Sequence, residues 1–175
     1  MKIQYKHQKF QADAAKAVVD VFAGQPYLTP TYMMDRGTTY QMSITDDVDF
    51  TGWSNQRIVP ELNDHLILEH LQKIQRANQI APSSKLEGRS EGFNLTIEME
   101  TGVGKTYTYI KTMYELNRAY GWSKFIIVVP SIAIREGVYK SFEMTQEHFA
   151  EEYGKKIRFF IYNSMQLTEI DRFAS

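Results

Sequence analysis

The residues best suited to chemistry form one short stretch of the chain: Glu100, Thr101, Gly102, Val103, Gly104, Lys105 and Thr106. Its two glycines allow the backbone to turn tightly, so that several N–H groups can point at one anion. Lys105 could then reach the β- and γ-phosphates of a nucleotide, and the Thr106 hydroxyl could coordinate Mg²⁺. The stretch therefore predicts a site for a nucleoside triphosphate and its metal ion, with residues 101–106 in binding and Lys105 and Thr106 in catalysis.

The pattern is incomplete, because Met99 stands where the motif G-x-x-x-x-G-K-[ST] has its first glycine. A glycine-rich turn that carries Lys and Thr by chance is the alternative interpretation. The flanking sequence favours a phosphate loop, since the stretch lies between a predicted strand and a predicted helix. A helix that begins near Gly104 would direct the positive end of its dipole at the bound phosphates.

The elements around this loop alternate between strand and helix. Residues 93–99 alternate apolar and polar side chains, and residues 124–129 and 157–162 are rich in β-branched and aromatic residues, as strands are. Helical stretches lie between these strands and would end at Gly121 and Gly154. Such an order implies right-handed crossovers, so we expect an α/β fold with a parallel sheet flanked by helices.

The chain before this core is less regular. Residues 10–22 have helical apolar spacing, and residues 61–79 carry a second amphipathic stripe. Between them we expect loops with one or two short strands, for example at 39–45, and a polar surface loop follows at 81–92. The predicted organisation is an N-terminal helix in residues 1–23, an irregular insertion with an amphipathic helix in 24–92, and the α/β core in 93–175.

The composition excludes several kinds of site. The 175 residues are 43% hydrophobic, carry a net charge of −1 and include no cysteine, which removes disulfides, Cys-ligated zinc, iron–sulfur clusters and a Cys nucleophile. The longest apolar run, residues 125–129, is too short to span a bilayer, so we expect a soluble, cytoplasmic protein. The histidines lack metal-ligand spacing and are expected at the surface or in structural roles: His7, His65, His70 and His148.

Three segments resemble motifs of superfamily 2 helicases. Residues 96–106 resemble motif I, and the form M-E-T-G-x-G-K-T at 99–106 is similar to that of the restriction (Res) subunit of type III restriction–modification enzymes. Residues 125–138 resemble the motif Ia region of that family, and Phe10 with Gln11 resembles the Q-motif. The resemblance implies the N-terminal part of a first RecA-like motor domain, incomplete at its C-terminal end. It would bind ATP and Mg²⁺, with Phe10 and Gln11 at the adenine.

The same resemblance implies contacts with DNA at the end of residues 124–129. Pro130, Ser131 and Arg135 would contact the DNA backbone, although Ser131 is also suited to cap the following helix. The full protein would couple ATP hydrolysis to action on duplex DNA and to its cleavage. Its partner would be a methyltransferase (Mod) subunit, and no membrane would be involved.

One part of a nucleotide-hydrolysing site is missing from the sequence. ATP hydrolysis needs an acid at another strand end to hold Mg²⁺, yet the dipeptide Asp-Glu does not occur in this chain. The resemblance places that acid, a second RecA-like domain and a nuclease domain beyond Ser175, so we expect a piece of a longer motor that is inactive alone. Two alternatives stay open: another superfamily 2 motor, from type I restriction or repair, and a nucleotide-gated module that binds DNA or protein without turnover.

Overall fold

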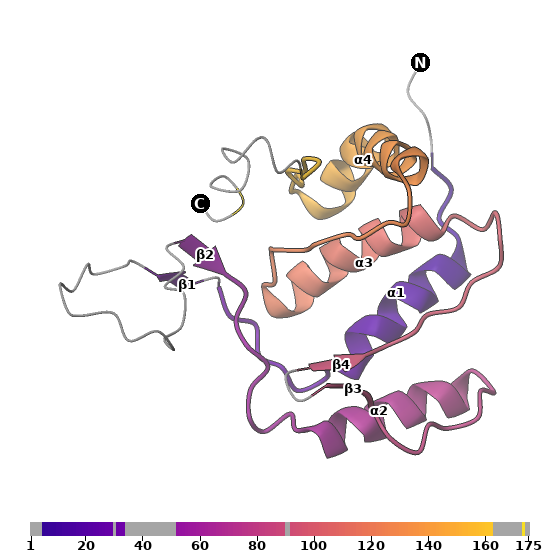
Figure 1. Cartoon of the computed structure of the whole chain (residues 1–175), viewed down its shortest axis with the longest axis vertical. Helices are drawn as coiled ribbons and strands as arrows, with labels where there is room; N and C mark the ends of the chain where they lie inside the picture. The colour runs from indigo at the N-terminus through magenta and orange to yellow at the C-terminus, as the bar shows by residue number, and fades with distance from the viewer. Residues whose placement is uncertain (1–4, 30, 34–51, 90–91, 163–172, 174–175) are drawn as a thin grey trace.

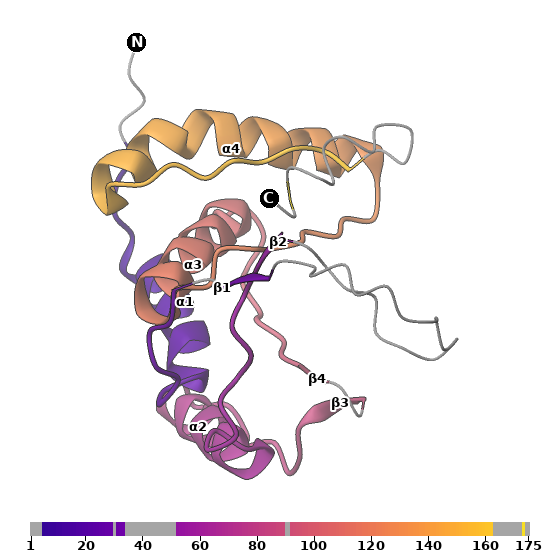
Figure 2. The same cartoon turned by 90° about the vertical axis from the view of Figure 1, so that its left-hand side faces the viewer.

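The computed structural model describes residues 5–29, 31–33, 52–89, 92–162 and 173. Within these residues the chain is mainly helical, with α1 (Lys9–Val21), α2 (Asp64–Ala77), α3 (Lys105–Tyr120) and α4 (Ile132–Tyr153). Figures 1 and 2 show the helices stacked in the order α4, α3, α1 and α2. None of the helices in the described part of the chain combines the length and the apolar character needed to cross a bilayer.

The first helix confirms the helix predicted for residues 10–22. Its apolar stripe turns Ala15 and Val21 into the interior, and Gln11 is buried beside them with 9% of its surface exposed. Ala14 and Val18, which also belong to the apolar spacing of residues 10–22, are half-buried. The helices α1 and α3 pack against each other, and the Tyr120 hydroxyl of α3 donates a hydrogen bond to the Val19 carbonyl at 2.8 Å.

The second helix confirms the amphipathic helix predicted for residues 61–79. Asn63 caps its start by accepting a hydrogen bond from the Leu66 N–H at 3.0 Å, as N-cap residues do. Ile67 faces inward with 1% of its surface exposed and forms a buried cluster with Leu62 and Val21. This cluster attaches α2 to α1.

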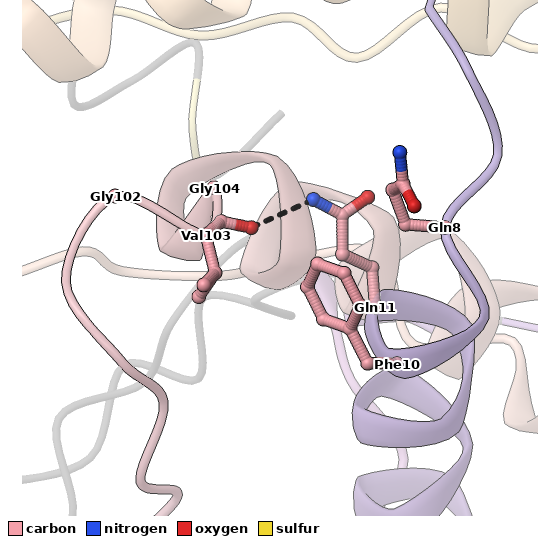
Figure 3. Close-up of a pocket in the computed structure, with 6 residues that line it drawn as sticks. All are labelled: Gln8, Phe10, Gln11, Gly102, Val103 and Gly104. Atoms are coloured by element: carbon pink, nitrogen blue, oxygen red, sulfur yellow. Dashed lines mark hydrogen bonds between the residues drawn. The ribbon is translucent and has the colours of Figure 1, made fainter.

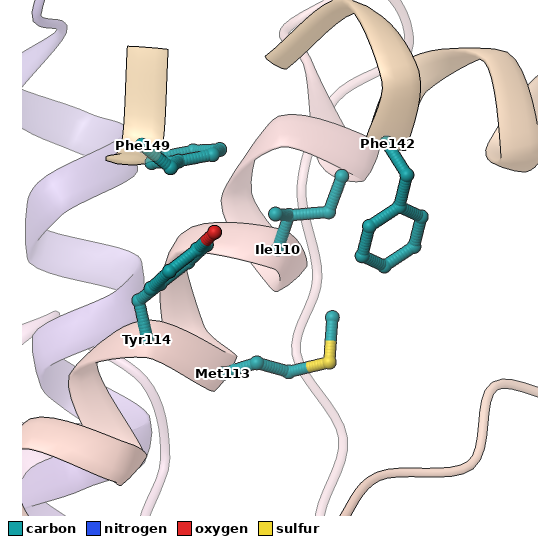
Figure 4. Close-up of a cluster of buried hydrophobic side chains, with 5 residues drawn as sticks. All are labelled: Ile110, Met113, Tyr114, Phe142 and Phe149. Carbon is teal, nitrogen blue, oxygen red and sulfur yellow. The ribbon is translucent and has the colours of Figure 1, made fainter. Parts of the chain in front are cut away.

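The third and fourth helices end where their glycines predict. Gly121 ends α3 at φ +79°, and an added Cβ would lie 2.1 Å from the Leu28 carbonyl oxygen, so only glycine fits. Figure 4 shows how apolar side chains of α3 and α4 meet between the two helices. This main core cluster consists of Ile110, Met113, Tyr114, Phe142 and Phe149. Burying a large apolar side chain stabilises a fold by about 1.5–3 kcal/mol, so this cluster holds α4 on α3.

The strands of the described residues are short and antiparallel. β1 (Thr31–Met33) pairs with β2 (Gly52–Ser54), and β3 (Glu87–Arg89) pairs with β4 (Gly92–Asn94). The second pair corrects the loop predicted for residues 81–92, which contains β3. The strand expected at 39–45 lies outside the described residues.

The predicted parallel sheet is not found among the described residues. Of the strand expected at 93–99 only its start is present, in β4, and residues 124–129 and 157–162 contain no strand. Ile126 and Val128 are 80% and 89% exposed, so the face of the segment that carries these two side chains is uncovered, whereas Phe125 packs against the main core cluster. A strand requires a neighbouring strand for its backbone hydrogen bonds. β-branched side chains favour a place in a sheet, but they do not supply that neighbour. The three-part division at residues 23 and 92 stays a prediction.

Candidate functional site

The phosphate-loop stretch has the backbone conformation that its glycines predict. Gly102 and Gly104 have φ values of +81° and +85°, in the left-handed region that glycine enters at little cost. The helix α3 begins at Lys105, and its first backbone hydrogen bond runs from the Thr108 N–H to the Gly104 carbonyl at 3.0 Å. The N–H groups of the first turn precede this bond, which leaves them available to an anion at the positive end of the helix dipole.

An open pocket of about 370 Å³ lies between this loop and the start of α1. Figure 3 shows Gln11 of α1 reaching across to the loop, where its Nε2 donates a hydrogen bond to the Val103 carbonyl oxygen at 2.9 Å. The Phe10 ring borders the same pocket, and 46% of its surface is exposed. The residues that line the pocket come equally from the two segments: Gln8, Phe10, Gln11, Gly102, Val103 and Gly104.

Gly104 also leaves room for the Gln11 amide. An added Cβ would lie 2.7 Å from Nε2 of Gln11, closer than real Cβ atoms come to their neighbours. A side chain at this position would therefore make the Gln11 amide move and would disturb its hydrogen bond with the Val103 carbonyl, in addition to the strain of the positive φ.

The predicted catalytic pair stands beside the pocket and does not line it. Lys105 is exposed, and none of the hydrogen bonds or ion pairs among the described residues involves its ammonium group. Thr106 is half-buried in the first turn of α3, and Thr101 is exposed before the loop. The structure thus brings Phe10 and Gln11 to the loop. The exposed Lys105 lies next to the loop, and its ammonium group has no ion-pair or hydrogen-bond partner among the described residues.

The residues expected to contact DNA lie apart, at the start of α4. The Ser131 hydroxyl accepts a hydrogen bond from the Ile134 N–H at 3.3 Å, so its capping role is confirmed. The Arg135 guanidinium lies 3.0 Å from the Glu136 carboxylate, with 41% and 51% of the side chains exposed, and Pro130 is exposed as well. Exposed ion pairs of this kind contribute about 0–1 kcal/mol, so Arg135 could exchange its partner for a phosphate.

A polar network between α3 and α4 was missed from the sequence. The buried Lys111 Nζ lies 2.5 Å from Glu152 Oε1 and donates a hydrogen bond to the Tyr153 hydroxyl at 3.0 Å. The Tyr153 hydroxyl donates onward to Glu115 Oε1 at 2.7 Å. Burial, together with the hydrogen bond to Glu115, raises the pKa of Tyr153 above its usual range. A lysine within the apolar face of α3 was the signal, but its partner lies 41 positions away and no spacing reveals it.

Two tyrosines of α3 contact α4. The Tyr114 ring stacks on Tyr153 with ring centroids 4.8 Å apart, and the Tyr107 hydroxyl lies 2.8 Å from His148 Nε2. Burial, which is the largest cause, raises the pKa of Tyr107 to about 12.

Comparison with known proteins identifies what the chain is similar to. Residues 50–171 match the family described as "Type III restriction enzyme, res subunit". The chain is 33% identical over 125 residues to the EcoP15I Res subunit of Escherichia coli, covering 70% of this chain and 13% of that protein. It is 45% identical over 62 residues to the StyLTI Res subunit of Salmonella typhimurium, covering 34% of this chain and 6% of the relative.

The family match and the segments that resemble the family's motifs do not cover the same part of the chain. The family match begins at residue 50, so it reaches into the middle region, where sequence reasoning found no resemblance. It does not include α1, which carries Phe10 and Gln11. The chain spans 13% or less of the length of these relatives.

Proposed function

The chain belongs to the family of type III restriction enzyme Res subunits, and we propose that it forms the ATP-binding part of a DNA translocase or helicase motor in such an enzyme. The observation that carries this proposal is the junction of α1 with the phosphate loop, where Gln11 bonds to Val103 across an open pocket. In this proposal the chain is the N-terminal part of a first RecA-like domain. It works in the cytoplasm on duplex DNA, with a Mod subunit as partner.

The residues around the pocket fit ATP and Mg²⁺. The loop N–H groups and the Lys105 ammonium would hold the β- and γ-phosphates, and the Thr106 hydroxyl would hold Mg²⁺. Bound ATP would supply the phosphoanhydride bond whose cleavage drives the motor. The Gln11 amide has one N–H on Val103, so its oxygen and its second N–H remain for the polar edge of adenine, and Phe10 would pack on the base.

The start of α4 is the proposed DNA contact. Pro130 and Ser131 are exposed there, and among the described residues the ion-pair partner of the Arg135 guanidinium is the exposed carboxylate of the neighbouring Glu136. A helix N-terminus with a hydroxyl and an arginine is a common arrangement for phosphate contacts. Such contacts would position the motor on DNA without reading its sequence.

An equilibrium binding experiment tests the nucleotide site. The 175-residue chain and its Lys105→Ala variant are titrated with Mg²⁺–ATP in a calorimeter, with Lys73→Ala as a matched control because Lys73 is an exposed lysine of α2. Hydrogen bonds to charged groups contribute about 1.5–3 kcal/mol, so Lys105→Ala should weaken binding about tenfold or more while the control leaves it unchanged. Equal affinities for wild type and Lys105→Ala would refute the assignment.

Turnover is a separate question. The sequence lacks an Asp-Glu pair, and ATP hydrolysis requires an acid at a strand end, so we expect this chain to bind ATP without hydrolysing it. Steady ATPase activity that Lys105→Ala abolishes would contradict this part of the proposal only. The nucleotide site itself would then stand.

A further inference from the structure

Three aromatic side chains, from residues 5–7 and from α3, lie around His148 of α4. Its ring centroid lies 5.0 Å from that of Tyr5, 5.7 Å from that of His7 and 5.7 Å from that of Tyr107. Tyr5 also stacks on Tyr107 at 5.7 Å, and the Tyr107 hydroxyl lies 2.8 Å from His148 Nε2. We call this group (Tyr5, His7, Tyr107 and His148) the His148 clasp. The ring of His148 is at its centre, with 16% of the side chain exposed.

The clasp is connected by the chain to both walls of the pocket. On one side, His7 is followed directly by Gln8, which is the N-cap of α1 and lines the pocket. On the other side, Tyr107 lies in the first turn of α3, two positions after Lys105. Since the clasp joins residues 5–7 to the first turn of α3 and to α4, it restrains the place where α1 begins relative to the phosphate loop.

We propose that His148 is a positioning residue for the nucleotide pocket and that it acts as a pH-sensitive clasp. In its neutral form the ring holds residues 5–7 against α3 and so keeps the start of α1 at the phosphate loop. Protonation of the ring loosens this hold and weakens nucleotide binding. The inference rests on the proposed function of the pocket as a nucleotide site, but the clasp itself can be measured without nucleotide.

The hydrogen bond with Tyr107 gives the chemical reason. A tyrosine hydroxyl keeps its proton over the physiological pH range, so it can donate to His148 Nε2 when the neutral ring carries its proton on Nδ1. A second proton on the ring makes both nitrogens donors. The Tyr107 hydroxyl must then turn to accept, and the bond that joins α4 to the first turn of α3 is remade in a different geometry.

The surroundings of His148 disfavour the charged ring. Burial lowers its pKa most; Glu152 raises it, His7 and Lys111 lower it, and Glu151 raises it slightly. The Glu152 carboxylate faces the ring, with Oε2 3.6 Å from His148 Nε2, but its Oε1 lies 2.5 Å from the Lys111 ammonium, so its negative charge is shared with a second cation. Because the pKa is lowered in the folded chain, the clasp is stable above the ordinary histidine pKa of about 6.5 and weakens as the pH falls below it.

Hydrogen exchange and nucleotide affinity measured between pH 5.5 and 7.5 test this inference. Wild type is compared with His148→Gln and with Tyr107→Phe, which keeps the ring and removes only the hydroxyl. The matched control is His65→Gln, because the side chain of His65 on α2 is 81% exposed. Amide exchange in residues 5–13 is followed without nucleotide at each pH and is expressed relative to the intrinsic amide exchange rate at that pH, because the intrinsic rate itself rises with pH. Mg²⁺–ATP affinity is titrated in parallel.

We expect wild type and His65→Gln to bind Mg²⁺–ATP about fivefold more weakly at pH 5.5 than at pH 7.5, with faster exchange in residues 5–13 relative to the intrinsic rate at each pH. A fivefold change is what we expect when the protein loses one hydrogen bond that stabilises the arrangement able to bind nucleotide. His148→Gln should bind weakly and exchange fast at both pH values, without the pH dependence. Tyr107→Phe should show about the same loss at pH 7.5 and a smaller pH dependence.

The outcomes separate the clasp from the nucleotide site. The clasp is refuted if His148→Gln keeps both the wild-type exchange in residues 5–13 and the wild-type pH profile of affinity, whatever Lys105→Ala does. It is equally refuted if exchange in this segment is independent of pH in wild type. If Lys105→Ala binds nucleotide as wild type does, the nucleotide site fails, and the exchange data alone then decide whether His148 holds the N-terminal segment.

Discussion

The buried ion pair between α3 and α4 permits a quantitative prediction of stability. The side chain of Lys111 is 7% exposed and that of Glu152 is 25% exposed, with Nζ and Oε1 2.5 Å apart. Glu152→Gln leaves the Lys111 ammonium in the interior with the Tyr153 hydroxyl as its remaining strong partner. Removing one member of a buried pair costs about 3–5 kcal/mol, and the partial exposure of Glu152 places the expected loss near the lower limit, about 3 kcal/mol.

Substitution of the other member of the pair, Lys111, should reduce the stability of the fold less. Lys111→Met removes the buried charge itself and leaves the carboxylate on the more exposed side chain, which can turn to water. The double variant Lys111→Met/Glu152→Leu should be less destabilised than the sum of the two single variants, because it leaves no unpaired charge. The asymmetry follows from burial: the partner that cannot reach water determines the loss.

Urea unfolding followed by far-ultraviolet circular dichroism measures these differences. A loss of about 3 kcal/mol corresponds to a fall in melting temperature of about 6–12 °C for a domain of this size. Asp13→Asn is the matched control, because it breaks an ion pair with Lys9 at 2.8 Å in which the side chains are 56% and 91% exposed. That control should leave the unfolding midpoint unchanged. If Glu152→Gln also leaves the unfolding midpoint unchanged, the buried ion pair of Lys111 with Glu152 does not stabilise the contact between α3 and α4, and the prediction is wrong.

Further substitutions test the loop and the core. Gly104→Ala, at φ +85° and 2.7 Å from Nε2 of Gln11, should destabilise the chain by about 1–2 kcal/mol and weaken Mg²⁺–ATP binding. Gly137→Ala in the exposed middle of α4 is its control and should stabilise by about 0.5–1 kcal/mol, so a loss in both would remove the positive-φ explanation. Phe149→Ala, at 0% exposure, should cost about 3–5 kcal/mol in urea unfolding, whereas Met144→Ala, at 55% exposure, should cost little. Equal midpoints for these two variants would contradict the core described between α3 and α4.

The helices could be predicted because their signals are local. Ser131 at the start of α4, and Gly121 and Gly154 at the ends of α3 and α4, act on the backbone next to them. A cap side chain bonds within three residues, and a glycine at positive φ ends a helix whatever packs around it. The apolar stripe of α1 was less well placed, because the face that is buried depends on the distant helices α2 and α3.

The site could be predicted only where its residues are neighbours in sequence. The loop at 101–106 contains its own glycines, lysine and threonine, so its chemistry was visible. Its proximity to Gln11 was not visible, since 92 positions separate the bonded residues Gln11 and Val103, and only a resemblance to the Q-motif suggested it. The same limit hid the pair of Lys111 with Glu152 and the meeting of His7 with His148, because each needs the packing of separate segments.

The segment of residues 124–129 has the composition of a strand, yet it forms no strand in the structure. At its start, the Asn55 side chain acts as a neighbouring strand would: Oδ1 accepts from the Ser123 and Lys124 N–H groups at 2.8 and 2.9 Å, and Nδ2 donates to the Lys124 carbonyl at 2.7 Å. One amide side chain can satisfy only these few backbone groups. Beyond it, Ile126 and Val128 are 80% and 89% exposed, and no strand pairs with them among the described residues. A strand forms when its whole backbone edge finds a partner, and among the described residues this β-branched run has a partner at its start and forms no sheet.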